Sequence, residues 1–405
     1  MASPASTQTC GSANPESPAP PDASKLKITH SKTPKPLQPV ETLRFGQTFS
    51  DHMIVANYDP ETGWSAPEIK PHGPITLDPS CSCFQYGGNV FEGMKAYLGP
   101  DGKARLFRPD LNMRRLERSC ARLALPPIDG DAVLELIQRL VDLERRWIPK
   151  ESGYSLYLRP TVIATKPGLG VMASDHAMLY ILAMPTGPFY RVLKPVALFA
   201  VSENVRAWPG GTGGHKIAGN YSPGFLPQQT AAEKGYDHIL WLFGDDRRIT
   251  EAGAMNFFVV VKRDDGDGEF QFDMFDMYHL LSVEGLDLIT APLDGTILPG
   301  VTRASCLALA GDPEFQKESS LRLHPQEMVY TMSDLEKWSS EGKFLEALAL
   351  GTSVIIIPCN KIGYEGKDIV LPGAGLGPVG TALRKKILDI QEGRTEWKGW
   401  GVVCP

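Results

Sequence analysis

One lysine, Lys216, lies in a glycine-rich stretch at residues 208–221 and has the setting of a reactive amine. Glycine adopts positive φ angles and leaves room for another molecule against the backbone. Most lysines are solvated surface cations, so the interpretation needs support elsewhere. Glu251 and the segment Pro-Gly-Val-Thr-Arg at residues 299–303 supply it. A lysine that bonds to a carbonyl, a carboxylate and an anion-binding turn are what pyridoxal phosphate requires of a protein.

The lysine and the carboxylate have separate tasks in this hypothesis. A lysine amine attacks a carbonyl only when it is deprotonated, so burial or neighbouring cations must lower its pKa. Once bonded to the cofactor, Lys216 can also move a proton at the substrate α-carbon. Glu251 could face the pyridine nitrogen and keep the ring protonated. The alternative for Glu251 is a solvated carboxylate at the edge of a helix.

Two turns could hold the phosphate. Residues 299–302 join an apolar run to a predicted helix start, where free N–H groups and the helix dipole favour an anion. Residues 351–353, Gly-Thr-Ser, could form a second turn of this kind. Taken alone, each pattern is also that of an ordinary helix N-terminus.

The elements that position these residues are expected to form two α/β domains, because 405 residues suffice for two to three domains. Residues 1–42 are rich in Pro, Ser and Ala and predict a disordered tail. A small N-terminal domain is expected at 43–184, a linker at 185–194 and a large C-terminal domain at 195–405. Periodicity predicts helices at 111–123, 132–147 (with Asp131 as N-cap), 223–234, 301–310 and 381–391, and strands at 154–163, 177–184, 196–202, 238–243 and 256–261.

Composition excludes several classes of function. The net charge of -6 argues against nucleic acid as a partner, since phosphate backbones attract basic surfaces. The sequence contains no apolar run of about 18 residues, so no membrane span is predicted. The seven cysteines are scattered without a C-x-x-C pair, which predicts no metal site and a reduced, intracellular protein. The first 42 residues carry no arginine, which favours the cytoplasm over mitochondria without excluding the latter.

Several separated motifs resemble the branched-chain amino acid aminotransferases, pyridoxal-phosphate enzymes of fold type IV, over residues 45–397. They are Phe-Gly-x-x-Phe-Ser-Asp-His-Met at 45–53, Val-Phe-Glu-Gly-Met-Lys-Ala-Tyr at 90–97, Leu-Phe-Arg-Pro-x-Leu-Asn-Met at 106–113 and Leu-Tyr-Leu-Arg-Pro at 156–160, followed by 216–221, 250–256 and 291–303. The resemblance implies a smaller N-terminal and a larger C-terminal domain with the cofactor between them.

The resemblance also implies roles for individual residues. Lys216 would be the catalytic residue and would bond to the cofactor aldehyde. Further contacts with the cofactor are implied for Arg115, Tyr221, Glu251, Val301, Thr302 and Thr352. Substrate contacts are implied for Phe45, Tyr86, Phe91, Tyr157, Arg159, Leu169, Val171 and Ser353. Of these, Leu169 and Val171 would reach the site of a partner subunit, so the resemblance implies a homodimer.

The expected reaction is transfer of the amino group of leucine, isoleucine or valine to 2-oxoglutarate. The alternatives are another fold type IV enzyme, either a D-amino acid aminotransferase or an aminodeoxychorismate lyase, and a binding or regulatory relative without activity. The sequence departs from the family pattern at Ala349-Leu350 in the turn before Gly351, where Leu350 could narrow or reshape the site, and at Ala254, where the family usually has threonine. Residues 269–284 are predicted to be an insertion.

Overall fold

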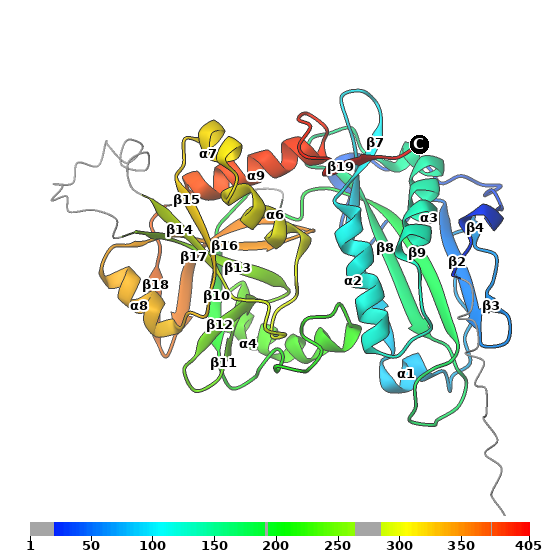
Figure 1. Cartoon of the computed structure of the whole chain (residues 1–405), viewed down its shortest axis with the longest axis horizontal. Coiled ribbons are helices and arrows are strands. Elements are labelled where there is room, and N and C mark those ends of the chain that lie inside the picture. The colour runs from blue at the N-terminus through cyan, green and yellow to red at the C-terminus, as the bar shows by residue number, and fades with distance from the viewer. Residues whose placement is uncertain (1–19, 191–192, 264–284, 374) are drawn as a thin grey trace, which may run out of the picture.

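The computed structural model describes residues 20–190, 193–263, 285–373 and 375–405, which form two domains lying side by side (Figure 1). The N-terminal and C-terminal domains are each built on one mixed sheet covered by helices. This confirms the two-domain α/β architecture expected from the sequence. The predicted insertion at 269–284 lies outside the described residues.

The sheet of the small domain is covered on one face by α2 (Pro109–Arg122) and α3 (Gly130–Leu143), with α1 (Ser82–Tyr86) at one end. Leu116 of α2 and Leu136 of α3 are fully buried against the sheet. The strand order is β1 (Lys27–Ile28), β4 (Glu68–Pro71), β2 (His52–Asp59), β9 (Ala177–Thr186), β8 (Ser155–Ala164), β6 (Met94–Leu98), β7 (Ala104–Phe107) and β19 (Gly401–Val403); β3 (Gly63–Trp64) pairs with β2, and β5 (Asn89–Phe91) with β8.

The sheet of the large domain closes into a barrel because β12 pairs with both β11 and β13. The strand order is β12 (Arg248–Ala252), β11 (His238–Phe243), β10 (Val196–Val201), β17 (Ile355–Tyr364), β16 (Phe344–Gly351), β13 (Met255–Lys262), β14 (Leu286–Thr290) and β15 (Leu323–Glu327), with β18 (Lys367–Val370) beside β17. Around the barrel lie α4 (Phe225–Glu233), α6 (Val301–Ala310), α7 (Pro313–Ser319), α8 (Met332–Ser340) and α9 (Pro378–Gln391). Among the described residues, no helix is long and apolar enough to cross a bilayer.

Most elements agree with the sequence-based prediction to within about three residues, but one helix cap was wrong. The side chain of Asp129, not that of Asp131, accepts the N–H of Ala132 at 3.0 Å and begins α3. Both aspartates suit a helix start, because Asp is favoured at the cap and in the first turn alike. The predicted linker also begins too early, since β9 continues through Thr186, which pairs with Ser155.

The prediction of a disordered tail over 1–42 is wrong for residues 20–42. Lys27 and Ile28 form a parallel pair with β4, and the segment that follows is held by buried polar groups. The N–H of Ser31 donates to His52 Nε2 at 2.8 Å, and His52 Nδ1 lies 2.5 Å from Glu144 Oε1. Pro-rich composition predicts a lack of core residues, but it does not reveal hydrogen bonds to a distant strand.

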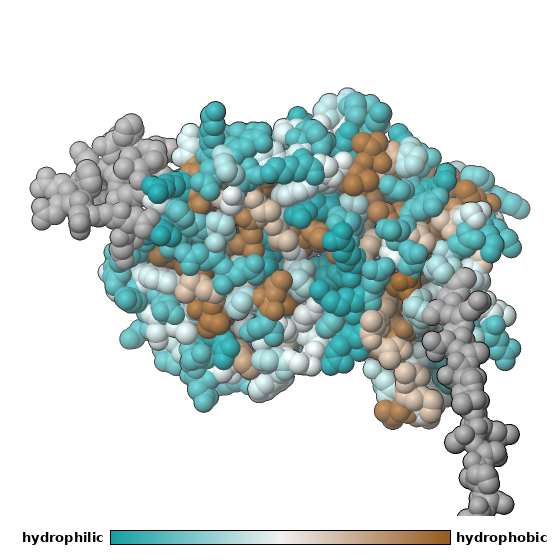
Figure 2. All heavy atoms as spheres, in the orientation of Figure 1, coloured by the Kyte–Doolittle hydropathy of each residue, from teal (hydrophilic) through white to brown (hydrophobic). Residues whose placement is uncertain are grey.

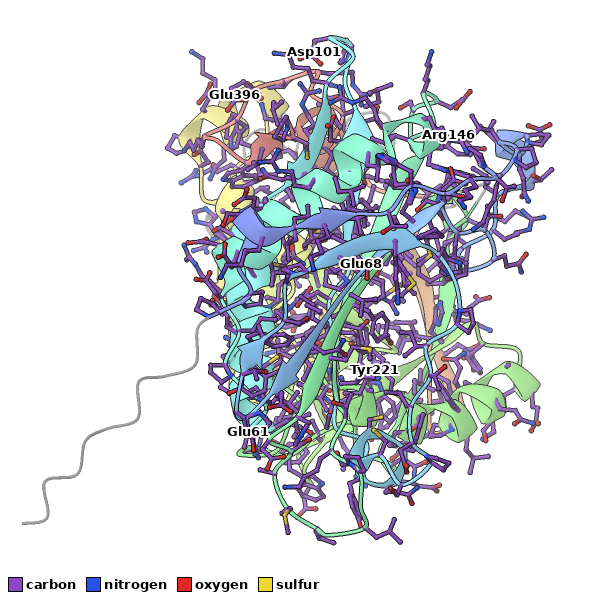
Figure 3. The ribbon with its side chains drawn as sticks, turned by 90° about the vertical axis from the view of Figure 1, so that its right-hand side faces the viewer. Glu61, Glu68, Asp101, Arg146, Tyr221 and Glu396 are labelled. Carbon is purple, nitrogen blue, oxygen red and sulfur yellow. The ribbon has the colours of Figure 1, made fainter. Side chains whose placement is uncertain are left out.

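Asp51 is the main anchor of this N-terminal arm, which we define as residues 20–42. Its carboxylate accepts the N–H of Lys35 at 2.8 Å, the indole N–H of Trp147 at 2.9 Å and the Arg146 guanidinium at 2.5 Å. Figure 3, which labels Arg146, views the small domain from its outer side. Burial alone would raise the pKa of Asp51, but these donors lower it below its usual value.

We expect Asp51→Asn to release the arm. The amide N–H₂ of asparagine would face the Arg146 guanidinium and the Trp147 indole N–H, which would then lack an acceptor. Each buried donor left without an acceptor destabilises the folded protein by about 1–3 kcal/mol. Hydrogen exchange of residues 27–35 should accelerate accordingly. The control is Asp142→Asn, which removes a half-exposed carboxylate facing Arg145 and should leave the exchange unchanged. Equal exchange in wild type and Asp51→Asn would show that the arm is held elsewhere.

The C-terminal boundary of the large domain also needs correction, because the predicted span 195–405 includes residues of the small domain. Strand β19 pairs with β7, and Cys404 is buried in the core between the small-domain sheet and its helices. The chain therefore returns to its first domain at its end (Figure 1). Three residues with little periodicity gave no signal for such a long-range pairing.

Candidate active site

Lys216 lies at the boundary of the two domains, and its backbone is held by the small one. Its carbonyl accepts the N–H of Phe91 at 3.1 Å, and its N–H donates to the hydroxyl of Ser119 on α2 at 3.0 Å. The side chain extends so that Nζ donates to Tyr221 Oη at 3.0 Å and lies 4.8 Å from the centre of the Phe91 ring. The predicted amine, phenol and aromatic ring are therefore brought together.

Glu251 lies on β12 and is 1% exposed, so its carboxylate depends on the groups around it. One oxygen accepts the N–H of Leu298 at 2.7 Å and the amide of Asn256 at 2.8 Å, and the other lies 2.7 Å from Arg206 Nε. Burial raises the pKa of Glu251, and Arg206, Leu298 and Lys216 partly offset that effect. The position of the Glu251 carboxylate is therefore fixed, and a cationic group bound beside it would further stabilise its ionised form.

Arg115 joins α2 of the small domain to the segment before α6 in the large one. Arg115 makes a bidentate ion pair with Glu92, with Nε 2.6 Å from Oε1 and Nη2 2.8 Å from Oε2. Its Nη1 donates to the carbonyl of Pro299 at 3.0 Å. Burial alone would raise the pKa of Glu92, but Arg115, Lys216 and Asn112 lower it below the usual value. Three of the five N–H donors of the guanidinium are thus engaged, which leaves two for a ligand.

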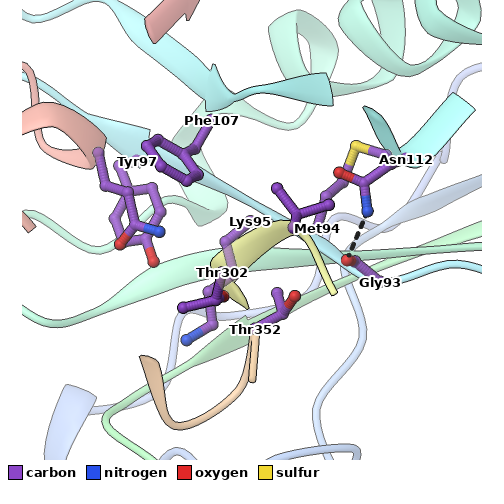
Figure 4. A pocket seen from close by; sticks show the side chains of 10 residues that line it. Gly93, Met94, Lys95, Tyr97, Phe107, Asn112, Thr302 and Thr352 are labelled. Atoms are coloured by element: carbon purple, nitrogen blue, oxygen red, sulfur yellow. Dashed lines mark hydrogen bonds between the residues drawn. The ribbon is translucent and has the colours of Figure 1, made fainter. Parts of the chain in front are cut away.

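The N-terminus of α6 provides backbone donors for an anion. The first turn of a helix has N–H groups without an intrahelical acceptor, and Gly300 at the N-cap has no side chain to cover them. A Cβ at Gly300 would lie 2.1 Å from Asn256 Oδ1, so this position requires glycine. Thr302 and Thr352, two of the predicted cofactor contacts, line one small cavity together with Val301 (Figure 4).

Apart from Ser353, the residues predicted to contact substrate divide into two groups, of which one adjoins Lys216 through Phe91. The rings of Phe45 and Tyr157 lie 4.9 Å apart, and Arg159 donates to Tyr157 Oη at 3.3 Å. The Arg159 guanidinium also lies 4.8 Å from the centre of the Phe91 ring, and its Nε is buried without a partner among the described residues. This arrangement offers apolar walls and one cation with a free donor.

The second group, Tyr86, Leu169 and Val171, lies at the end of the small domain that carries α1. Leu169 and Val171 are 67% and 85% exposed, and Tyr86 Oη donates to the carbonyl of Leu169 at 2.5 Å. Figure 2 shows apolar surface at the lower end of this domain, near α1. Within one chain Leu169 and Val171 thus lie in an exposed apolar loop, to which Tyr86 at the end of α1 is hydrogen-bonded.

Several residues that hold the site were missed by the sequence analysis. Arg206 and Asn256 fix Glu251, and Glu92 fixes Arg115. A charged residue in the apolar strand 89–98 is a signal that could have identified Glu92, because buried charges are paired. Arg206 follows an ordinary strand and offers no comparable signal. The structure also shows why Leu350 does not narrow the site: its side chain packs in the core under α6 and α9.

The residues present fit pyridoxal phosphate. The amine of Lys216 and the hydroxyl of Tyr221 adjoin the Phe91 ring, and the buried carboxylate of Glu251 suits a protonated ring nitrogen. The α6 N-terminus and Arg115 together suit a phosphate dianion. Among the described residues, no group of three or more His, Cys, Asp or Glu is arranged to hold a metal ion.

Comparison with known proteins agrees with this geometry. The family described as Amino-transferase class IV matches residues 89–362. Branched-chain-amino-acid aminotransferases of Schizosaccharomyces pombe (mitochondrial) and Saccharomyces cerevisiae (cytosolic) are each 42% identical over 394 residues, covering 95% of this chain and 86% and 98% of theirs. A branched-chain aminotransferase structure from Thermoproteus uzoniensis has a TM-score of 0.66 at 22% identity, covering 87% of this chain and 100% of its own.

The fold and the lysine site thus define a class IV aminotransferase with the fold type IV architecture. Within that class, the chain belongs to the family of branched-chain-amino-acid aminotransferases, since the identities extend over nearly its whole length.

Proposed function

We propose that this protein uses pyridoxal phosphate to transfer the amino group of leucine, isoleucine or valine to 2-oxoglutarate. The observation that carries the proposal is the convergence of the Lys216 amine, the buried Glu251 carboxylate and the α6 N-terminus at one domain boundary. Relatives that are 42% identical and named for this reaction support the substrate class. Bound pyridoxal phosphate supplies an aldehyde that takes up the amino group and a ring that withdraws electrons.

In this proposal the protein positions the reactants and moves one proton. Lys216 Nζ takes the proton from the substrate α-carbon and returns it, and Tyr221 Oη keeps that amine in place. Glu251 keeps the ring nitrogen protonated through its fixed negative charge. The phosphate would be held by Arg115, by the first turn of α6, which contains Val301 and Thr302, and by Thr352.

The apolar substrate side chain is proposed to lie among the rings of Phe45, Phe91 and Tyr157. A ring-lined pocket distinguishes alkyl chains that differ by one methylene by only about 1–3 kcal/mol, so all three branched amino acids should be accepted. The carboxylate of the substrate is assigned to the N–H of Ser353. Arg159, whose buried Nε has no partner among the described residues, is proposed to bind the second carboxylate of 2-oxoglutarate.

We also propose that the enzyme is a homodimer in which the loop bearing Leu169 and Val171 contacts the other subunit. Monomeric proteins rarely leave contiguous apolar side chains this exposed. Light scattering of the purified protein should therefore give twice the mass of one chain. Val171→Asp should shift the equilibrium toward monomer, while Val370→Asp, an equally apolar exposed site on β18, should not. A monomeric wild type would contradict this part of the proposal.

A substrate screen tests the proposed reaction directly. The purified protein, incubated with pyridoxal phosphate, should form glutamate from 2-oxoglutarate with leucine, isoleucine and valine as donors. The D-enantiomers of these amino acids and an aminodeoxychorismate lyase assay are the matched controls. Strict preference for D-amino acids, or protein that stays colourless with the cofactor, would reject the proposed function.

A further inference from the structure

The turn that carries Thr352 and Ser353 is closed by an unusual residue. Gly351 pairs with Ile355 at the end of the β16–β17 hairpin, which leaves a three-residue loop between them. Such loops commonly end on a left-handed residue, usually glycine. Here the left-handed residue is Ile355, which directly follows the three loop residues and has a φ of 67°, a conformation strongly disfavoured for a β-branched side chain. Strained backbone of this kind persists only where the surroundings hold it.

Lys95 supplies one such restraint from the opposite domain. It lies on β6 of the small domain, and its Nζ donates to the carbonyl oxygen of Ser353 at 2.9 Å. In a trans peptide the C=O and the following N–H point in opposite directions. A hydrogen bond that fixes the Ser353 carbonyl therefore also fixes the direction of the next N–H, and with it the path of the turn.

The surroundings of Lys95 make simple core packing a poor explanation for a lysine there. The side chain is 5% exposed, and it lines the cavity of about 20 Å³ that also contains Thr302 and Thr352 (Figure 4). Burying an ammonium group is costly, and methionine would fill the same space without that cost. Some contact must therefore compensate, and among the described residues the hydrogen bond from Lys95 Nζ to the Ser353 carbonyl can do so.

Neighbouring charges do not provide this compensation. Burial, with the positive charge of Arg384 on α9, lowers the pKa of Lys95 to about 7. The other polar groups of α9 and β6 that face this region are Glu392, Gln391 and Tyr97. Tyr97 Oη and Gln391 Oε1 have no hydrogen-bond partner among the described residues. No carboxylate within salt-bridge distance of Lys95 occurs in the described part of the chain.

We propose that Lys95 is a positioning residue that holds the 352–354 turn of the large domain, next to the strained Ile355, so that Thr352 meets the cofactor phosphate and Ser353 the substrate carboxylate. The inference rests on the proposed function, since it concerns the same site. It adds a link between domains: the small domain sets the geometry of donors that belong to the large one, over a separation of 258 residues in sequence.

The test is Lys95→Met, which keeps the volume and removes the donor. Loss of a charge-assisted hydrogen bond should raise the dissociation constant for pyridoxal phosphate and the KM for leucine by about 10- to 100-fold. The turnover number should change much less, because Lys216 and Glu251 are untouched. Lys95→Arg, which also donates to a carbonyl, should recover part of the loss. If Lys95→Met does not fold, Lys95→Gln is the alternative, because it keeps a polar group but is too short to reach Ser353. It should likewise raise the cofactor dissociation constant and the KM for leucine while changing the turnover number much less.

Lys386→Met is the matched control, because it removes another buried lysine, which lies on α9 and contacts α7 within the large domain. Lys386 pairs with Glu318 at 2.6 Å and lies 3.9 Å from the centre of the Trp397 ring. It should lower the Tm without changing either binding constant. Unchanged KM and cofactor affinity in Lys95→Met, or equal changes in Lys386→Met, would overturn the inference. A wild type without transaminase activity would instead overturn the proposed function.

Discussion

Replacing Lys216 by alanine is expected to abolish transamination, with turnover falling by at least about 10⁴-fold. Two functions are lost at once: the amine that bonds to the cofactor aldehyde and the base that moves the α-proton, which alone contributes about 10²–10⁴-fold. Steady-state glutamate formation measures the first consequence. Borohydride reduction followed by peptide mass analysis measures the second, since the wild type should carry the cofactor on the peptide containing Lys216.

Two further variants separate this effect from general damage. Tyr221→Phe keeps the ring contact with Phe91, 5.0 Å between centres, but removes the hydroxyl that accepts the Lys216 hydrogen bond. It should retain the covalent cofactor and lose about 10- to 100-fold in turnover, in keeping with one polar contact near 1.5–3 kcal/mol. Lys234→Ala removes an exposed lysine that lies over the Phe199 ring and should behave as wild type. Turnover by Lys216→Ala near the wild-type rate would refute the assignment.

The residues behind this prediction could be recognised from the sequence because they lie in short, contiguous motifs. Lys216 and Tyr221 are five residues apart, and Val301 and Thr302 begin a helix whose periodicity is visible. Their supporting residues come from elsewhere in the chain. Ser119 reaches the Lys216 backbone over 97 residues. Such pairs depend on how the two domains pack, and no local pattern of hydrophobicity encodes that.

The fold follows the same division between local and distant information. Helices and central strands were predicted because each satisfies its own period of apolar residues. The closure of the barrel depends on the pairing of Glu251 with Asn256 in β12 and β13, which also aims the carboxylate. The N-terminal arm and β19 were missed because two- and three-residue strands have too few residues to show a period. β1 and β19 pair with the small-domain sheet through backbone bonds, which any sequence can make, and the side chains that hold the rest of the arm lie far from it in sequence.

The second large effect is expected for Glu251→Gln, which should lower turnover by about 10²-fold with little change in KM. The amide keeps an acceptor for the Leu298 N–H but carries no charge to hold the ring nitrogen protonated. Arg206 also loses its ion-pair partner, which destabilises the folded protein by about 3–5 kcal/mol, because a buried charge is left uncompensated. Urea unfolding and steady-state kinetics measure the two consequences separately.

Glu346→Gln provides the control for the loss of a buried carboxylate. Glu346 accepts the N–H groups of Val379 and Gly380 at the start of α9, at 2.8 and 3.0 Å, and has no place in the proposed chemistry. Its replacement should lower stability but leave the turnover of the folded protein unchanged. If both variants lose activity in proportion to stability, the role assigned to Glu251 is wrong.

The pH dependence of stability gives an independent test of Glu251. Burial raises the pKa of Glu251 in the folded protein above the ordinary 4.5. At a pH between 4.5 and the raised pKa, the folded chain therefore keeps a proton on Glu251 that the unfolded chain has released. Stability of the cofactor-free protein should therefore fall as pH rises through that window. A protonated ring nitrogen beside Glu251 favours the carboxylate, so bound pyridoxal phosphate should reduce this fall. Glu251→Gln should remove the difference between the two forms, because it leaves no proton to release at that position.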